Sequence, residues 1–446
     1  MESSAFDQLL AKFKHPVSSP SKGWWTLMII MLVLVVFGLV GLVQQIKHGH
    51  IVTGMRDHVV WGIFIVNFIF FLGIGYAGAI LAGIFHLTRL QWAKPLHRIA
   101  VLFSLVGLCI GPIFIFLCVG RLDRILYLFK YARIQSPITW DVLAILTNLI
   151  LVSTYLYIAH IRDFAKLRDT QVFSMPGWKR RLYTKLALGF RSTPQQITHL
   201  NRAQNVLAAT MIPTAILADS LLAWLFGMSL RPGWHSTLFA PEFILVAIFS
   251  GVALLILLMW IYRQKYGLHS LITGQHFQYA GYVLLMLSLG FAYFTFSEYI
   301  TEWYNINETH GRWLDKFLTF GEFGMMSAVT ISFAIVIPIT VLIIPKLRNP
   351  GSITFISVLI LVGLWFKRYL IIVPTLETPY LPIQDIRSEY VNYGATWVEW
   401  SLSLAGLGLG VIILLLLNFM APVIPVADIE HDDEIIVPEP FYETSK

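Results

Sequence analysis

Apolar residues run along the chain in ten long blocks, and a short polar segment separates each block from the next. A membrane-spanning helix needs about 20 mostly apolar residues, and each block reaches that length. The pattern therefore predicts ten transmembrane helices. We expect them at 24–45, 59–87, 99–120, 140–160, 203–227, 241–262, 276–298, 319–345, 352–374 and 397–424.

The composition supports a membrane protein. Hydrophobic residues make up 57% of the 446 residues and charged residues only 13%, whereas soluble domains are about 45–50% apolar and 25% charged. The fold class expected is all-α and integral to the membrane, with lipid as the solvent. The formal net charge of +7 then reflects basic loops facing anionic lipid and the cytoplasm, and nucleic acid is not expected as a partner.

Both ends of the chain are polar. The N-terminal segment 1–23 is long for a signal peptide, and no small-residue cleavage site follows the first apolar block, so we expect that block to remain as a helix. The C-terminal segment 425–446 is acidic and is expected to lie on a partner or to stay disordered. Its acidic residues include Asp428, Glu430, Asp432, Asp433 and Glu434.

Lysine and arginine predict the orientation of the helices. The N-terminal segment, the even-numbered loops and the tail together carry 20 of the 32 Lys and Arg residues, and loop 161–202 alone carries nine. Because basic loops stay on the cytoplasmic side, both termini are predicted to be cytoplasmic.

Several cofactor classes lack the residues that they need. A b-type haem requires paired histidines inside the bilayer, but the histidines fall in loops or near block ends, as His86 and His160 do. Cys109 and Cys118 form no iron–sulfur motif, and no phosphate-binding loop occurs. We therefore expect no haem or metal on this chain, and a self-contained redox carrier or primary pump is disfavoured.

Ionisable residues inside a bilayer are costly and usually functional. Here they fall towards the predicted extracytoplasmic ends of the blocks, together with Arg121, Trp234 and His235. Glu298 and Glu322 are better explained as interfacial anchors, whereas the deeper Asp219 needs a partner. The ionisable residues are Asp141, Asp219, Glu298, Glu322, Lys367 and Arg368, and Arg368 matches Asp219 in depth.

A set of motifs carries a resemblance to a known family. The segments are WGIFIVNF (61–68), GIGYAGAILAGIF (73–85), CVGR (118–121), RIQSPITWDV (133–142), PGWHSTLFAPEFILVAIFSG (232–251), LWFKRYLIIV (364–373) and APVIPVADI (421–429). In this order they resemble the NrfD/PsrC-like subunits, the family of the polysulfide-reductase membrane anchor. The ten blocks and the PGWHS segment look closest to the large membrane subunits of bacterial alternative complex III.

The resemblance implies a fold and an assembly. The fold would be two four-helix bundles, 59–227 and 241–374, with flanking helices 24–45 and 397–424. The protein would lie in a bacterial inner membrane, as part of a respiratory or photosynthetic complex that oxidises a quinol such as menaquinol. Its expected partners are an extracytoplasmic iron–sulfur or molybdopterin-like subunit that receives the electrons, other membrane subunits, c-type cytochrome subunits and lipid.

The same resemblance assigns roles to residues. Asp141, in its WD context, would accept a quinol proton. Cys118 and Tyr76 stand where many relatives have histidine, and this departure weakens the case for a quinol site. The quinone contacts would be Asn67, Tyr76, Cys118, Arg121, Trp234 and His235. The proton pathway would use Asp219, Glu298, Glu322, Lys367 and Arg368.

Two other functions remain open. The chain could be the paralogous subunit of the same complex, which supports assembly or conducts protons without binding quinone. A secondary transporter is less favoured, because transporters place polar groups and broken helices near the bilayer midplane, whereas the charges here gather towards one face.

Overall fold

The computed structural model describes most of the chain, and no strand occurs within the described part. The predicted N-terminal segment as far as residue 19, the acidic tail from residue 426, Arg121 and His235 lie outside the described residues. The described residues are 20–120, 122–169, 176–229, 231–234, 236–304, 308–317, 321–378 and 392–425.

Ten helical segments are long and apolar enough to cross a membrane, which confirms the ten predicted spans. They are α3 (Lys22–His48), α4 (Gly62–Thr88), α5 (Lys94–Cys118), α7 (Pro137–Asp169), α9 (Pro194–Gly227), α10 (Phe239–Lys265), α11 (Gly274–Tyr304), α13 to α14 (Gly324–Ile343), α15 (Pro350–Leu376) and α17 (Trp397–Met420). Shorter elements are η1 (Gly49–Val52), η2 (Gln91–Ala93), η3 (Leu122–Arg124), α6 (Tyr127–Lys130), α8 (Gly177–Leu186), α12 (Glu308–Asp315) and η5 (Pro345–Leu347).

Some helices continue beyond the apolar blocks that predicted them. The fourth block ends at residue 160, but α7 continues to Asp169. Most of the added residues are not solvent-exposed, although Asp169 itself is: Leu167 is buried, and Asp163 forms a buried ion pair with Arg98 of α5. A charge that is paired inside the protein permits a helix to extend past the point where hydropathy falls.

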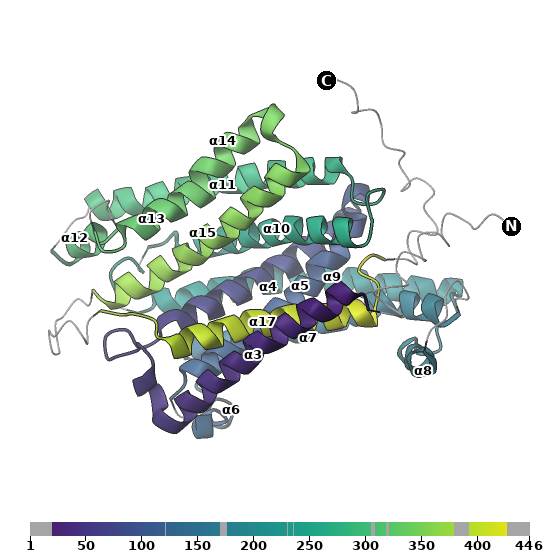
Figure 1. Ribbon diagram of the computed structural model, residues 1–446, viewed down its shortest axis with the longest axis horizontal. Coiled ribbons are helices and arrows are strands. Elements are labelled where there is room, and N and C mark those ends of the chain that lie inside the picture. The colour runs from purple at the N-terminus through teal and green to yellow at the C-terminus, as the bar shows by residue number, and fades with distance from the viewer. Residues whose placement is uncertain are drawn as a thin grey trace.

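The spans form two groups. In the first, α4 packs against α5 and α9, and α7 packs against α9 and α5. In the second, α10 packs against α11 and α15, and α15 also contacts α13 and α14. The groups meet where α4 lies against α10 and α15, and Figure 1 shows the second group above the first.

The eighth span contains an irregular turn. α13 (Gly324–Ile331) passes into the π-helical η4 (Ser332–Val336), and α14 (Ile337–Ile343) follows. Pro338 lies at the start of α14. Because proline has no N–H and its ring crowds the preceding turn, a wider turn before it is the expected accommodation.

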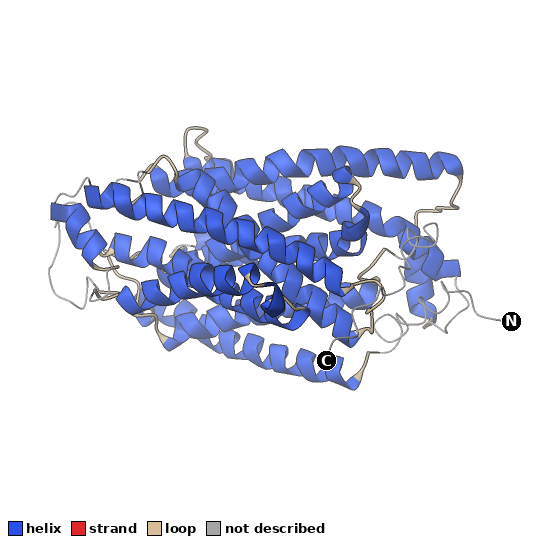
Figure 2. Ribbon diagram, turned by 90° about the horizontal axis from the view of Figure 1, so that it is seen from above, coloured by secondary structure: helices blue, strands red, loops and turns tan. Residues whose placement is uncertain are grey.

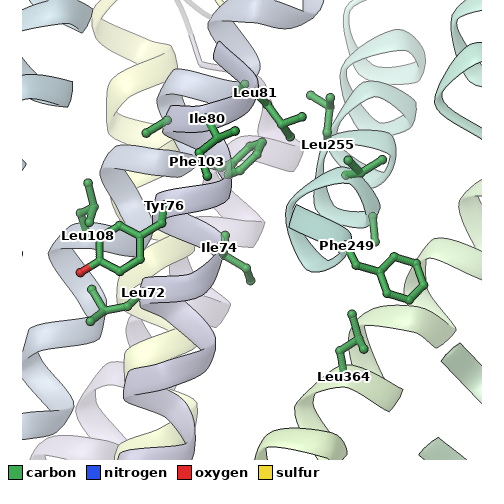
Figure 3. Packing of buried hydrophobic residues seen from close by; sticks show 14 of the residues in the cluster. Leu72, Ile74, Tyr76, Ile80, Leu81, Phe103, Leu108, Phe249, Leu255 and Leu364 are labelled. Carbon is green, nitrogen blue, oxygen red and sulfur yellow. The ribbon is translucent and has the colours of Figure 1, made fainter. Parts of the chain in front are cut away.

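α4 is the most enclosed span. Its side chains pack against α5 on one side and against α10 and α15 on the other, and Figure 3 shows Tyr76 lying beside Leu108 of α5 while Ile74 points to the opposite side. Its contact with α5 is close, because a Cβ on Gly107 would lie 2.5 Å from the carbonyl oxygen of Phe71. Residues carried by α4 are therefore held in a rigid position.

The flanking spans α3 and α17 pack against each other, and α17 also contacts α5. Much of α3 faces outward, with Ile29, Val33 and Val36 each more than half exposed, as expected of a lipid-facing helix. Close approach to α17 depends on Gly38, where an added Cβ would lie 2.2 Å from the Cβ of Ala405. Small residues permit such contacts between membrane helices.

Gly38→Ala is therefore expected to weaken the α3–α17 contact. Overpacking of a close contact costs about 1–3 kcal/mol, so the thermal midpoint of the detergent-solubilised protein should fall. Gly23→Ala on the same helix is the matched control, because the added Cβ would lie 3.9 Å from the Ser21 hydroxyl, an ordinary van der Waals contact. Equal midpoints for the two variants would contradict this helix contact.

All ten spans have their ends at two faces of the molecule (Figure 2). One face, here called the site end, carries the loop between α9 and α10, α12 and the starts of α4, α10 and α17. The other face, here called the basic end, carries α8 and the starts of α5 and α9. The N- and C-terminal parts of the described chain lie at the basic end (Figure 1).

Candidate functional site

Three charged side chains form a buried group near the site end, here called the lysine triad. The Lys367 Nζ lies 2.6 Å from Glu298 Oε2 and 3.0 Å from Glu242 Oε1. The side chains of Lys367, Glu298 and Glu242 are 6%, 11% and 4% exposed. One ammonium group thus faces two carboxylates in an environment with little water, which makes the triad a natural place to hold a proton.

A small cleft opens beside the triad, with a cavity volume of about 10 Å³, which is about the space that one water molecule needs. Five of its eleven lining residues are aromatic, and Glu298 and Lys367 are its charged groups. The other lining residues are Gly233, Trp234, Phe239, Tyr299, Trp313, Phe317, Leu370, Ile371 and Thr375. Indole groups hold the rim in place, since Trp234 Nε1 donates to the Ile371 carbonyl at 2.8 Å and Trp313 Nε1 donates to Thr375 Oγ1 at 2.9 Å.

Sequence reasoning did not assign Glu242 to the site. It lies in the first turn of α10, within the motif PGWHSTLFAPEF. A carboxylate so close to a helix N-terminus is usually explained by the helix dipole, and its burial is not visible in the sequence. Glu242 lies about one helical turn after Phe239, which places both side chains on the same face of α10. This spacing was the one signal in the sequence that could have assigned Glu242 to the site.

A second buried group, here called the first-bundle cluster, consists of Tyr76 on α4, Asp141 on α7 and Asp219 on α9. The residues are 0%, 5% and 1% exposed. Tyr76 is within electrostatic range of both carboxylates, and the carboxylates are within range of each other. The structure therefore brings together three residues that the sequence placed on three different spans.

The first-bundle cluster has unmet hydrogen-bonding capacity. The Tyr76 hydroxyl, Asp141 Oδ1 and both carboxylate oxygens of Asp219 are buried and have no hydrogen-bond partner among the described residues. Buried polar atoms are nearly always satisfied by protein, water or ligand. In Figure 3 the Tyr76 side chain projects from α4 on the side of Leu108 and Leu72. The cluster is thus suited to receive a polar molecule with a donor and an acceptor.

Arg368 lies between the two groups. Its guanidinium is 4.4 Å from the centroid of the Phe243 ring and is in electrostatic range of both Asp219 and Glu242. It forms no direct hydrogen bond with Asp219, because both carboxylate oxygens of Asp219 lack a partner within the described part of the chain. Asp219 and Arg368, which were expected to pair because they lie at the same depth, are thus near each other but form no direct hydrogen bond.

Two predicted quinone contacts are engaged in packing. Asn67 accepts a hydrogen bond from Trp365 Nε1 at 2.9 Å and donates to Ser403 Oγ at 2.8 Å, which ties α4 to α15 and α17. Cys118 Sγ lies 3.7 Å from the Trp61 carbonyl. These contacts give both side chains a structural role, and their roles in quinone binding stay predictions.

Trp234 connects the site-end loop to the first group of spans. Its indole stacks on Trp61 with ring centroids 6.3 Å apart and also contacts Phe226 of α9. Because Trp61 precedes α4 and also contacts Phe226, these rings fill the space between the lysine triad and the end of α5. Trp234 therefore forms one wall of the cleft and part of the bundle contact.

Glu322, the remaining predicted residue, is about half exposed at the site end, with its carboxylate 3.5 Å from Lys316 Nζ. Lys316 also donates to the buried Glu377 at 2.7 Å. Burial raises the pKa of Glu377, and the hydrogen bond from Lys316 opposes that rise. Glu377 in turn accepts from the backbone N–H of Tyr393 at 2.7 Å.

Glu399 closes this network. It is fully buried and accepts from the Tyr393 hydroxyl at 2.5 Å, from the Gly54 N–H at 2.7 Å and from the Thr396 N–H at 2.9 Å. Because both carboxylate oxygens are used, Glu399 holds the start of α17 against the segment before α4. Neither Glu377 nor Glu399 was predicted from the sequence, and we interpret both as structural.

At the basic end, polar contacts hold the bundle together. Arg98 pairs with Asp163 and donates to the carbonyl of Ile424 at 3.2 Å. His97 is 2.6 Å from the Tyr155 hydroxyl. Within the described residues, no group of three or more His, Cys, Asp or Glu side chains is arranged to hold a metal ion.

Comparison with known proteins identifies the family. The model of the family described as "Polysulphide reductase, NrfD" matches residues 51–379. A putative dimethyl sulfoxide reductase membrane subunit of Halobacterium salinarum is 28% identical over 53% of this chain, an alignment that spans half of that relative.

Two relatives align over almost the whole length. A selenate reductase subunit of Mesobacillus selenatarsenatis is 22% identical over 89% of this chain and 93% of its own. The Hdr-like menaquinol oxidoreductase integral membrane subunit of Archaeoglobus fulgidus is 24% identical over 88% and 91%. With ten candidate spans and a family match over most of its length, the chain is a multi-pass integral membrane protein of the NrfD family.

Proposed function

We propose that this chain is the quinol-handling membrane subunit of an oxidoreductase complex, with its quinol site at the first-bundle cluster. The observation that carries the proposal is that the Tyr76 hydroxyl and Asp141 Oδ1 are both buried, lack a hydrogen-bond partner among the described residues and belong to side chains in electrostatic range of each other. A hydroxyl can donate to a quinone carbonyl, and a carboxylate can accept a proton from a quinol hydroxyl. The menaquinol oxidoreductase subunit among the relatives supports the same substrate class.

The proposed reaction is the oxidation of a quinol, for which we favour menaquinol, to the quinone. Two electrons leave the quinol and pass to an iron–sulfur or molybdopterin-like partner subunit at the site end, and two protons leave with them. Asp141 accepts the first proton, and Asp219 lies in range to receive it in turn.

The proton route that we propose crosses between the two groups of spans. Arg368 is in range of Asp219 on one side and Glu242 on the other, and Glu242 shares Lys367 with Glu298. Glu298 lines the cleft, from which water can carry the proton away. Glu322, exposed at the site end, would be the last acceptor. Carboxylates and cations alternate in the middle of the route, where Arg368 lies between Asp219 and Glu242 and Lys367 lies between Glu242 and Glu298.

The finer assignment that we propose is a large membrane subunit of a complex like alternative complex III, in a bacterial inner membrane. Other membrane subunits and c-type cytochrome subunits would complete the assembly. The site end would then face the extracytoplasmic side, and both termini would be cytoplasmic.

A second candidate is the paralogous subunit that conducts protons or supports assembly without a quinone. The engagement of Asn67 and Cys118 in packing favours it, since two of the predicted quinone contacts are then occupied. The two candidates differ in whether the first-bundle cluster binds a quinone head group.

The deciding experiment is a binding measurement on the purified complex. A fluorescent quinol analogue, 2-heptyl-4-hydroxyquinoline N-oxide, should bind with an affinity that falls about tenfold in Tyr76→Phe, the loss expected for one hydrogen bond. Tyr157→Phe is the matched control, because its hydroxyl bonds to the Leu186 carbonyl at the other end of the bundle. Equal affinities in the wild type and Tyr76→Phe would favour the paralogue.

The orientation makes a separate prediction. Lys185 and Arg133 are both exposed, at the basic end and the site end respectively. In right-side-out vesicles, an impermeant maleimide should label Arg133→Cys and leave Lys185→Cys unlabelled until the membrane is opened. The chain without an added cysteine is the control for Cys109 and Cys118. The reverse labelling pattern would invert the proposed orientation.

A further inference from the structure

The short helix α8 (Gly177–Leu186) lies at the basic end, across the ends of the spans. Figure 1 views α8 nearly along its axis, whereas the spans run across the picture. One side of α8 is fixed to the end of α17, because Lys179 Nζ donates to the Phe419 carbonyl at 2.6 Å and the Tyr183 hydroxyl donates to the Met420 carbonyl at 3.0 Å. These carbonyls belong to the last turn of α17 and have no partner within that helix.

The other side of α8 is exposed and basic. Arg180, Arg181 and Lys185 are exposed there. The Arg180 Nε donates to the Arg168 carbonyl at 3.2 Å, which positions the Arg180 guanidinium. The nearby acidic residue, Asp169, is paired with Arg168 and is also in electrostatic range of Arg180, so its single negative charge leaves the basic residues in excess.

Apolar side chains stand at both ends of this basic face. Trp178 is 55% exposed at the start of α8, and Leu188 is 70% exposed just after it. Leu188 has φ 47° and is followed by Gly189 with φ 69°. A left-handed backbone conformation is unfavourable for leucine. Leu188 nevertheless adopts this conformation, and its apolar side chain lies at the surface.

We propose that the exposed face of α8 binds the head groups of anionic phospholipids at the membrane surface. A helix that lies across the ends of the spans is at the depth of the lipid phosphates, where tryptophan is favoured by its mixed polar and apolar ring. Three exposed bases match the charge of phosphodiesters, and the flanking Trp178 and Leu188 insert beside the acyl chains. This surface is independent of the proposed quinol site.

The test uses the purified complex and native mass spectrometry with dioleoyl-phosphatidylglycerol, against dioleoyl-phosphatidylcholine. Each exposed base near a membrane surface contributes about fivefold in affinity. The triple variant Arg180→Gln, Arg181→Gln, Lys185→Gln should therefore lose about 100-fold in affinity for phosphatidylglycerol and little for phosphatidylcholine. It keeps Lys179 and Tyr183, so the docking of α8 on α17 is retained.

The matched control removes three exposed bases from the site end: Arg124→Gln, Lys130→Gln, Arg133→Gln. It should keep the wild-type preference for phosphatidylglycerol. The proposal is overturned if the α8 variant keeps its affinity, if both triple variants lose it equally, or if both lipids are lost together. It is also overturned if phosphatidylglycerol binds only after removal of residues 426–446, because the acidic tail would then be the occupant of this face.

Discussion

Lys367→Met is expected to lower the stability of the protein by about 3–5 kcal/mol, the usual cost of removing one partner from a buried ion pair. The substitution leaves Glu242 and Glu298 facing each other with no cation between them, and both are nearly inaccessible to water. Methionine has a volume close to that of the lysine stem, so packing changes little. The loss of stability in Lys367→Met therefore measures the electrostatic contribution of Lys367.

The measurement is the thermal midpoint of the solubilised complex, followed by a cycle of variants. The triple variant Glu242→Gln, Glu298→Gln, Lys367→Met should recover most of the lost stability, because neutral replacements of a whole buried ion group are often tolerated. Lys346→Met is the control for loss of one positive charge, since Lys346 is exposed. A stable Lys367→Met with wild-type midpoint would show that the carboxylates do not depend on this lysine.

The spans could be predicted from the sequence because the solvent imposes them. Every backbone group in lipid must be bonded within the segment, so a long apolar block has no alternative to a helix. The ends were less well predicted, as α7 shows. In α7 the pairing of Asp163 with Arg98 permits both charged residues to be buried. A hydropathy scale treats each charged residue as unpaired, so it predicted the end of this helix too early.

The lysine triad could not be predicted, because hydropathy gives depth and not direction. Asp219 and Arg368 both lie eight residues before the ends of their helices, so depth alone suggested a pair. Lys367 is adjacent in sequence, but a helix turns by about 100° per residue. Lys367 therefore faces Glu298 and Glu242, while Arg368 is directed towards the first group of spans.

The motif residues divide in a similar way. Tyr76 was chosen from the resemblance and Asp141 also from its charge within an apolar block, and the structure places them in electrostatic range of each other. Asn67 came from the same motifs but links three helices through its amide. A residue's membership of a family motif indicates that the family needs it. It does not indicate whether the residue is needed for ligand binding or for helix packing.

Asp141→Asn is expected to lower quinol turnover by the complex about 100-fold or more, the contribution usual for a general base. Asparagine keeps the shape of the side chain, and its amide cannot accept the quinol proton. The buried position of Asp141, 5% exposed, leaves little access for bulk water to replace it. Binding of the quinol analogue should change much less than turnover, since the hydrogen-bonding contact is partly retained.

The measurement is steady-state turnover with a soluble menaquinol analogue, with the presence of every partner protein checked on the same preparation. Thr147→Val is the control on the same helix, because its hydroxyl bonds to the Leu143 carbonyl one turn away. Wild-type turnover in Asp141→Asn, with the complex fully assembled, would remove Asp141 from the reaction. If Glu298→Gln then abolished turnover, the proton acceptor would be the lysine triad, and the quinol site would lie in the cleft beside Trp234 and not in the first-bundle cluster.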